Sequence, residues 1–95
     1  MNLKEIEYVV TIAEEQKLAR AAEKLFVTPS ALTQQLNNIE REIGTPLFYR
    51  SRNGWVPTDA GLIYLKSAKE ILQIRHETDK KLQDLVDSHQ GTLTI

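Results

Sequence analysis

The sequence of 95 residues contains no cysteine, only three prolines and four glycines, and a single tryptophan. Without cysteine the chain has no disulfide, no thiolate nucleophile and no cysteine-bound zinc, which fits a reducing cytoplasm. No apolar run approaches the roughly 18 residues that a membrane-spanning helix needs. No charged segment followed by an apolar stretch opens the chain. We therefore expect a cytoplasmic protein with no secretory signal and no membrane partner.

Residues that carry enzyme chemistry or bind metals are scarce. His76 and His89 stand alone in polar sequence, with no acidic or thiol partner at a metal-ligand spacing. The chain has no glycine-rich phosphate loop and no nucleophile paired with a base. These absences predict that this chain is not an enzyme and holds neither a metal nor a cofactor.

Positive charge is limited and unevenly placed. The chain has 12 basic and 13 acidic residues, a net charge of −1. Residues 1–16 carry a net charge of −3, residues 17–56 of +3 and residues 57–95 of −1. Within the basic segment, no Lys or Arg occurs between Leu25 and Glu40. The stretch "VTPSALTQQL" in that gap is therefore polar but uncharged.

Apolar residues recur at helical spacing near the N-terminus and predict two helices, over residues 2–15 and 18–25. The second is short and rich in alanine. Its small side chains, such as Ala21 and Ala22, allow another helix to cross closely.

A third helix is predicted over about 29–42. Thr28 is a good N-cap and Pro29 suits the first helical position. Gly44 favours an end to the helix, and Pro46 prevents its continuation.

The segment after this helix predicts a β-hairpin. Two short β-prone runs flank Asn53-Gly54, the strongest two-residue signal for a tight turn. Pro57 ends the second strand, where an edge position tolerates it.

The aromatic residues predict packing rather than ligand contacts, and we place Tyr8, Phe26, Phe48 and Tyr64 in the core. Two alternative roles fit Trp55. It either closes the core beneath the hairpin or stacks at the sugar-phosphate edge of a nucleic acid. Packing is the commoner use of a lone Trp.

A long helix is predicted over 59–88, capped by Thr58 and stopped by Gly91. Its apolar stripe has roughly heptad spacing. A helix of this length cannot pack fully on so small a domain, and its stripe would otherwise be exposed. We therefore predict dimerisation through Leu65, Ala68, Leu72, Leu82 and Val86.

A short helix, a tight turn and a second helix with a polar outer face form a helix-turn-helix signal. Such a second helix buries one face and offers the other to the major groove of DNA. The outer face here carries Ser30, Gln34, Asn37 and Arg41, flanked by Thr33 and Asn38. Gln and Asn pair bidentately with adenine there, and Ser and Thr bond base edges or phosphates. An ordinary solvated face would instead mix Glu and Lys.

Affinity for DNA comes largely from basic groups on phosphates. We predict such contacts for Lys17 and Arg20 before the turn, and for Arg50 and Arg52 on the hairpin, which then acts as a wing. Lys24 is better explained by solubility. A second class of function remains open, a protein-interaction module in which the long helix is the functional element.

Four segments resemble the N-terminal DNA-binding region of LysR-type transcriptional regulators: "AAEKL", "ALTQQLNNIEREIGTPLFYR", "PTDAG" and "GTLTI". The resemblance implies a mainly helical fold, a winged helix-turn-helix at residues 1–58 and a linker helix at 59–88 that pairs antiparallel with a second subunit. It implies that residues 89–95 begin an effector-binding domain, absent here, which takes a small molecule. Family members bind dyad-related operators in double-stranded DNA, as homodimers that usually assemble into homotetramers.

The resemblance also assigns roles by position. Thr28, Pro29, Ser30, Thr33 and Gln34 match the DNA-contacting start of the recognition helix, and Arg50 and Arg52 match the wing contacts. The chain departs from the family where Ser-Gln-Pro is usual, since it has Thr28-Pro29-Ser30, and where Ser-Arg is usual, since it has Thr33-Gln34.

Overall fold

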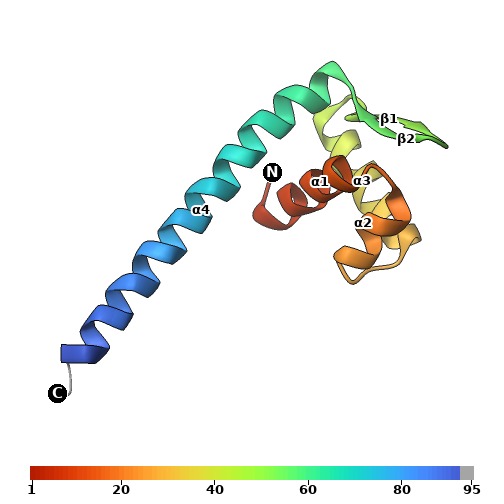
Figure 1. Cartoon of the computed structure of the whole chain (residues 1–95). Coiled ribbons are helices and arrows are strands. Elements are labelled where there is room, and N and C mark those ends of the chain that lie inside the picture. The colour runs from red at the N-terminus through yellow and green to blue at the C-terminus, as the bar shows by residue number, and fades with distance from the viewer. Residues whose placement is uncertain (93–95) are drawn as a thin grey trace.

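The computed structural model describes the backbone of residues 1–92, and over that range the chain is mainly helical (Figure 1). The elements are α1 (Leu3–Glu15), α2 (Leu18–Lys24), α3 (Pro29–Ile43), β1 (Phe48–Ser51), β2 (Gly54–Pro57) and α4 (Asp59–Thr92). The three short helices and the hairpin form one unit, and α4 projects from it as a long rod (Figure 1). The predicted fold class, a winged helix-turn-helix followed by a long helix, is confirmed.

Helix α1 lies at the centre of this unit and contacts α2, α3, α4 and β2. It begins with a reciprocal cap, in which the Glu5 N–H donates to the Asn2 side chain at 2.9 Å and the Asn2 N–H donates to the Glu5 carboxylate at 3.3 Å. On its inner face, Val9 and Ile12 are completely buried. Burying a side chain of this size stabilises a fold by about 1.5–3 kcal/mol. The packing of the other elements around α1 provides this burial.

Helix α2 contacts both α1 and α3. Its buried residues are the small Ala21 and Ala22, whose missing bulk permits a close approach of packed helices. The Val27 N–H donates to the Ala22 carbonyl at 3.0 Å and closes the end of α2.

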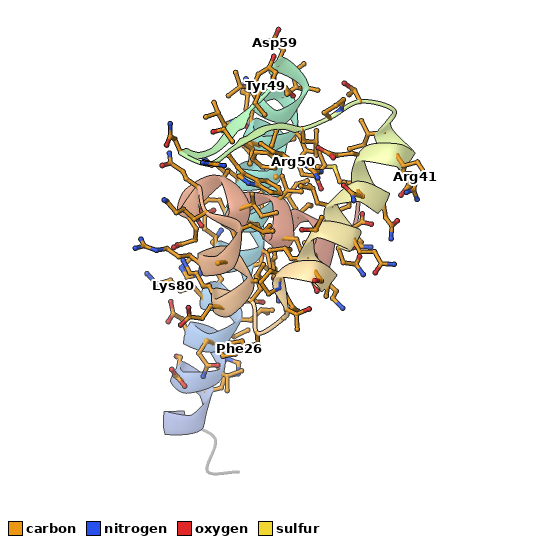
Figure 2. The ribbon with its side chains drawn as sticks, turned by 90° about the vertical axis from the view of Figure 1, so that its right-hand side faces the viewer. Phe26, Arg41, Tyr49, Arg50, Asp59 and Lys80 are labelled. Carbon is orange, nitrogen blue, oxygen red and sulfur yellow. The ribbon has the colours of Figure 1, made fainter. Side chains whose placement is uncertain are left out.

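The turn that follows α2 places Phe26 at the surface, where it is labelled in Figure 2. Its φ is +60° and its side chain is 94% exposed. The prediction that Phe26 belongs to the core was wrong. The left-handed backbone that the tight turn requires directs this side chain away from the core.

The wing is an antiparallel hairpin in which Ser51 pairs with Gly54. Its two loop residues are therefore Arg52 and Asn53, and the predicted Asn53-Gly54 turn was wrong by one residue. Pro57 is the last paired residue of β2, as predicted.

Gly54 stands where the chain leaves the hairpin turn and β2 passes the end of α1. It is buried with φ +140°, and a Cβ there would lie 3.4 Å from the Gln16 carbonyl oxygen. The Trp55 N–H donates to that same oxygen at 2.7 Å. The positive φ therefore favours glycine at position 54, and the Trp55 hydrogen bond joins β2 to the end of α1.

Helix α4 begins at the predicted cap. The Thr58 hydroxyl accepts from the Gly61 N–H at 3.0 Å and donates to the Pro46 carbonyl at 2.8 Å. One residue therefore starts the helix and ties it to the segment that precedes β1.

The first half of α4 packs against α1. Leu65 and Ala68 are buried there in the core of the protomer. Arg75 on α4 donates to the Glu7 carboxylate of α1 at 2.6 Å. Leu65 and Ala68, predicted at a dimer interface, are thus already covered by their own chain.

The second half of α4 extends into solvent (Figure 1). Residues 76–89 are all exposed, among them Leu82 and Val86. The helix continues through Gly91 to Thr92, so the predicted end at 88 was wrong, because a glycine near a helix end costs only about 1 kcal/mol. Of the segment 89–95, expected to begin an effector-binding domain, the part beyond Thr92 lies outside the described residues. None of the described helices is long and apolar enough to cross a membrane.

Candidate nucleic-acid interface

Helix α3 presents one buried and one exposed face. Its cap is the Thr28 hydroxyl, which accepts from the Ala31 N–H at 3.1 Å, and Pro29 occupies the first turn. Leu32, Leu36 and Ile39 are buried against α1 and α2. The predicted separation of apolar and polar faces is therefore present.

The opposite face of α3 lines a shallow groove together with Leu18 at the start of α2. Seven residues of α3 contribute: Pro29, Ser30, Thr33, Gln34, Asn37, Asn38 and Arg41. Thr33 is half-buried and the other six are exposed. The only formal charge among them is that of Arg41, near the C-terminal end of α3 (Figure 2). The structure thus brings together the predicted polar residues of this helix.

Arg50 of β1 is held by α3 rather than left free. Its Nη2 donates to Glu40 Oε1 at 2.6 Å and to Asn37 Oδ1 at 2.8 Å. Its guanidinium lies over the Trp55 ring, 4.9 Å from the ring centroid. Glu40 Oε2 accepts from the Leu47 N–H at 2.6 Å. This Glu40 cluster, formed by Arg50, Asn37, Glu40 and Leu47, fixes the wing to α3.

Arg52 differs from Arg50. It occupies the loop of the hairpin, is exposed, and makes no hydrogen bond or ion pair with any described residue. Its charge is therefore available to a partner, whereas that of Arg50 is compensated by Glu40.

The basic residues around α2 also divide into two kinds. Lys17 and Arg20 are exposed and unpaired among the described residues, and Lys17 precedes Leu18 of the groove. Lys24 forms an ion pair with Glu15 at 3.4 Å, so its charge is already compensated at the protein surface.

Trp55 is half-buried beneath the hairpin. Its ring lies 6.1 Å from the ring of Phe48, at an interplanar angle of 52°. The indole thus packs against the core, and Arg50 covers its face.

Tyr64 of α4 carries a buried polar group. Its hydroxyl is buried and has no hydrogen-bond partner among the described residues. Burial, with a smaller contribution from the Glu5 carboxylate, raises the pKa of Tyr64 to about 12. It lines an apolar hollow of about 390 Å³ between α1, α3 and α4. Within the described range no three His, Cys, Asp or Glu residues gather as metal ligands would.

Glu40, which bonds both Arg50 and the Leu47 N–H, was not among the residues predicted from the sequence. Its signal was present: it is the first charge after a long uncharged stretch of α3, three residues beyond Asn37. Residues at that spacing share a helix face. Its partner Arg50 lies ten residues further on, in a different element. The periodicity of apolar and polar residues within a helix does not predict such a pair.

A recognition helix held by a short helix on one side and a wing on the other defines a winged helix-turn-helix protein, a class that places its second helix in the major groove. The family model described as "Bacterial regulatory helix-turn-helix protein, lysR family" matches residues 3–62. The chain belongs to this family, and it is a LysR-family DNA-binding domain of a transcriptional regulator.

Relatives cover the whole chain. It is 36% identical over 96 residues to the HTH-type transcriptional regulator BsdA of Bacillus subtilis (strain 168), covering 100% of this chain and 33% of that protein. It is 36% identical over 94 residues to a probable RuBisCO transcriptional regulator of Emiliania huxleyi, covering 99% of this chain and 30% of that one. The chain thus spans about a third of the length of these curated relatives.

Solved structures of DNA-binding domains superpose closely. The BenM DNA-binding domain in complex with benA site 1 DNA is 27% identical with a TM-score of 0.83, over 94% of this chain and 100% of that one. The CbnR DNA-binding domain in complex with DNA is 28% identical with a TM-score of 0.77, over 90% and 99% of the two chains.

Proposed function

We propose that this chain places α3 in the major groove of operator DNA, with the wing at the adjacent backbone or minor groove. The observation that carries the proposal is the exposed face of α3, which is polar and free of charge up to Arg41. Amides and hydroxyls on a groove-facing helix are the groups that bond base edges. The proposed contacts on and before this helix are Thr28, Pro29, Ser30, Thr33, Gln34 and Asn37.

The attraction to DNA comes from outside this face. Arg52, Lys17 and Arg20 are exposed and uncompensated among the described residues, and each phosphate that they neutralise releases counterions. Arg50 contributes mainly by positioning the wing. Affinity and discrimination are thereby divided between different elements.

We further propose that the protein is a dimer through α4. The support is the apolar surface on the free half of this helix, where Leu82 is 56% and Val86 49% exposed, with Leu72 half-buried at its base. An antiparallel partner helix would cover this stripe. Two copies in twofold symmetry would then present two α3 helices to a dyad-related operator, since protein and operator symmetry match.

The dimer is tested by sedimentation of two variants that introduce the same residue on opposite faces of α4. Leu82→Gln removes an apolar side chain from the stripe, and we expect a dissociation constant raised about tenfold or more. Lys80→Gln, placed about 200° away around the helix, should leave the dissociation constant within about twofold. Equal behaviour of the two variants would rule out the stripe as the interface.

For the whole protein, we propose a cytoplasmic homotetramer whose further domain binds a small-molecule effector. The length of the curated relatives supports such a domain, because this chain spans about a third of them. No cofactor is proposed for the present chain.

The primary test is titration onto random duplex DNA at two salt concentrations. Binding that weakens steeply with salt supports phosphate contacts, whereas a protein-interaction module would show no salt-dependent binding. Selection of bound sequences from a random pool then tests base reading, and a dyad-symmetric consensus is the expected result.

A further inference from the structure

We infer that the three amides lining the groove read different bases: Asn37 and Asn38 act as donors to acceptor edges such as guanine, and Gln34 alone is equipped for adenine. The inference rests on the proposed entry of α3 into the major groove. It comes from where each amide oxygen is already engaged.

The orientation of Asn37 is fixed by the chemistry of its partner. Arginine has only hydrogen-bond donors, so the Asn37 atom that lies 2.8 Å from Arg50 Nη2 must be the amide oxygen. Arg50 is itself held by Glu40 at 2.6 Å and by the Trp55 ring. The Asn37 oxygen therefore stays turned toward the wing, and its NH₂ group remains available.

Asn38 repeats the arrangement one residue later. Arg41 Nη1 donates to Asn38 Oδ1 at 3.1 Å, and the same donor rule fixes this amide. Arg41 has no acidic partner among the described residues, so it holds the Asn38 amide less firmly than Arg50 holds that of Asn37. Both asparagines nevertheless present NH₂ donors rather than oxygens.

Adenine recognition by an amide needs both ends of the group. The oxygen accepts from adenine N6 and the NH₂ donates to N7. At Asn37 a second donor would have to approach the oxygen beside the Arg50 guanidinium, where the positive charge disfavours it. The free NH₂ suits the adjacent acceptors of guanine, N7 and O6.

Gln34 keeps both ends of its amide. It is exposed, lines the same groove, and makes no hydrogen bond with any described residue. It is the one amide of the three that offers an unoccupied oxygen together with its NH₂. It is also the residue that stands where the family usually has Arg, so the chain has an adenine-reading group at that position.

Selection of DNA from a random pool with the wild type, Asn37→Ala and Gln34→Ala tests the assignment. Asn37→Ala should abolish a preference for guanine at one position of each half-site, and Gln34→Ala a preference for adenine at another. Loss of an adenine preference in Asn37→Ala, or loss of no preference at all, would overturn the inference. A wild type that binds no duplex would instead refute the proposed function.

Base analogues sharpen the test at the selected positions. Replacing that guanine with 7-deazaguanine removes the N7 acceptor and should weaken wild-type binding about tenfold but leave Asn37→Ala unaffected. Replacing the adenine with purine, which lacks the 6-amino group, should weaken the wild type and leave Gln34→Ala unaffected. Equal losses in variant and wild type would contradict the assignment.

A further experiment removes the hydrogen bond to the Asn37 oxygen, so that this oxygen becomes available to a base. Arg50→Met removes the donor, and adenine should then be accepted at the guanine position. Arg52→Met, on the same wing but without contact to α3, should lower affinity for all sequences and leave the guanine preference intact. A retained guanine preference in folded Arg50→Met would contradict the claim that Arg50 fixes the orientation of the Asn37 amide. If that variant fails to fold, the base analogues still decide.

Discussion

The Arg50 guanidinium and the Glu40 carboxylate lie 2.6 Å apart where the recognition helix meets the wing. The Glu40 side chain is only 12% exposed, and its second oxygen holds the Leu47 N–H. This pair connects the last part of α3 to β1, so it sets where the wing stands relative to the groove.

Glu40→Gln should therefore destabilise the protein. The substitution keeps the size of the side chain but removes the charge that two donors share, and charged hydrogen bonds contribute about 1.5–3 kcal/mol each. We expect the free energy of unfolding in urea to fall by about 2 kcal/mol. Glu42→Gln, at an exposed acid with no described partner, is the matched control and should change it by less than about 0.5 kcal/mol.

Arg52→Ala should weaken binding to all DNA sequences alike. Its charge is exposed and unpaired among the described residues, so the loss is one phosphate contact and the salt slope should fall by about 1. Binding isotherms at several salt concentrations measure the slope. A sequence-dependent loss would instead assign Arg52 to base reading.

Phe26→Asn should stabilise the fold. Phe26 holds φ at +60° with its side chain in solvent, and Asn tolerates this backbone region better than other residues with a Cβ. We expect the free energy of unfolding to rise by about 0.5–1 kcal/mol. Phe26→Ala removes the ring but keeps the strain, so a similar gain in both variants would trace the effect to the ring.

Tyr64→Phe should leave stability at neutral pH unchanged or raise it by about 1 kcal/mol, because the buried hydroxyl has no described partner. The pH dependence should also change. The tyrosine pKa is near 10 in an unfolded chain and about 12 here, so between these values only the folded protein retains the proton. The free energy of unfolding therefore falls as pH rises from 10 to 12.

Denaturation of the wild type and Tyr64→Phe across this pH range checks the expectation. The fall should be smaller in the variant. Tyr49→Phe, at a tyrosine that is 66% exposed, should retain the wild-type fall.

Gly61→Ala should be strongly destabilising. A Cβ at Gly61 would overlap the Leu47 carbonyl oxygen, which accepts the Thr58 N–H at 3.0 Å. Because backbone must move, we expect a loss of about 3 kcal/mol in urea denaturation. Gly44→Ala meets no atom within 4 Å and bears only the cost of φ +96°, about 1 kcal/mol. A milder effect at position 61 than at 44 would contradict this packing.

Much of the fold was predictable because its determinants are local. Thr28 and Thr58 cap their helices with their own side chains, and the apolar spacing along α1 and α3 selects which face is buried. These features depend on residues a few positions apart, so the sequence carries them directly. The polar outer face of α3 follows from the same spacing.

The errors have both local and long-range causes. The turn of the hairpin was displaced by one residue: Gly54 has φ +140° and pairs with Ser51, and the Trp55 N–H beside it donates to the Gln16 carbonyl of a distant segment. Phe26 was placed in the core from its apolar character, yet the geometry of the turn decides its exposure. Leu65 and Ala68 satisfy a heptad pattern, which does not distinguish a partner helix from α1 of the same chain.

By itself, the sequence determined that this protein is a winged helix-turn-helix with an uncharged recognition face and a long following helix. Capping, periodicity and turn propensity act over a few residues and are written in consecutive letters. Only the tertiary structure decided which polar groups on that face are free. Arg50 donates to Asn37 and Glu40 across thirteen and ten residues, and whether an amide oxygen is occupied depends on side chains that folding brings within 3 Å.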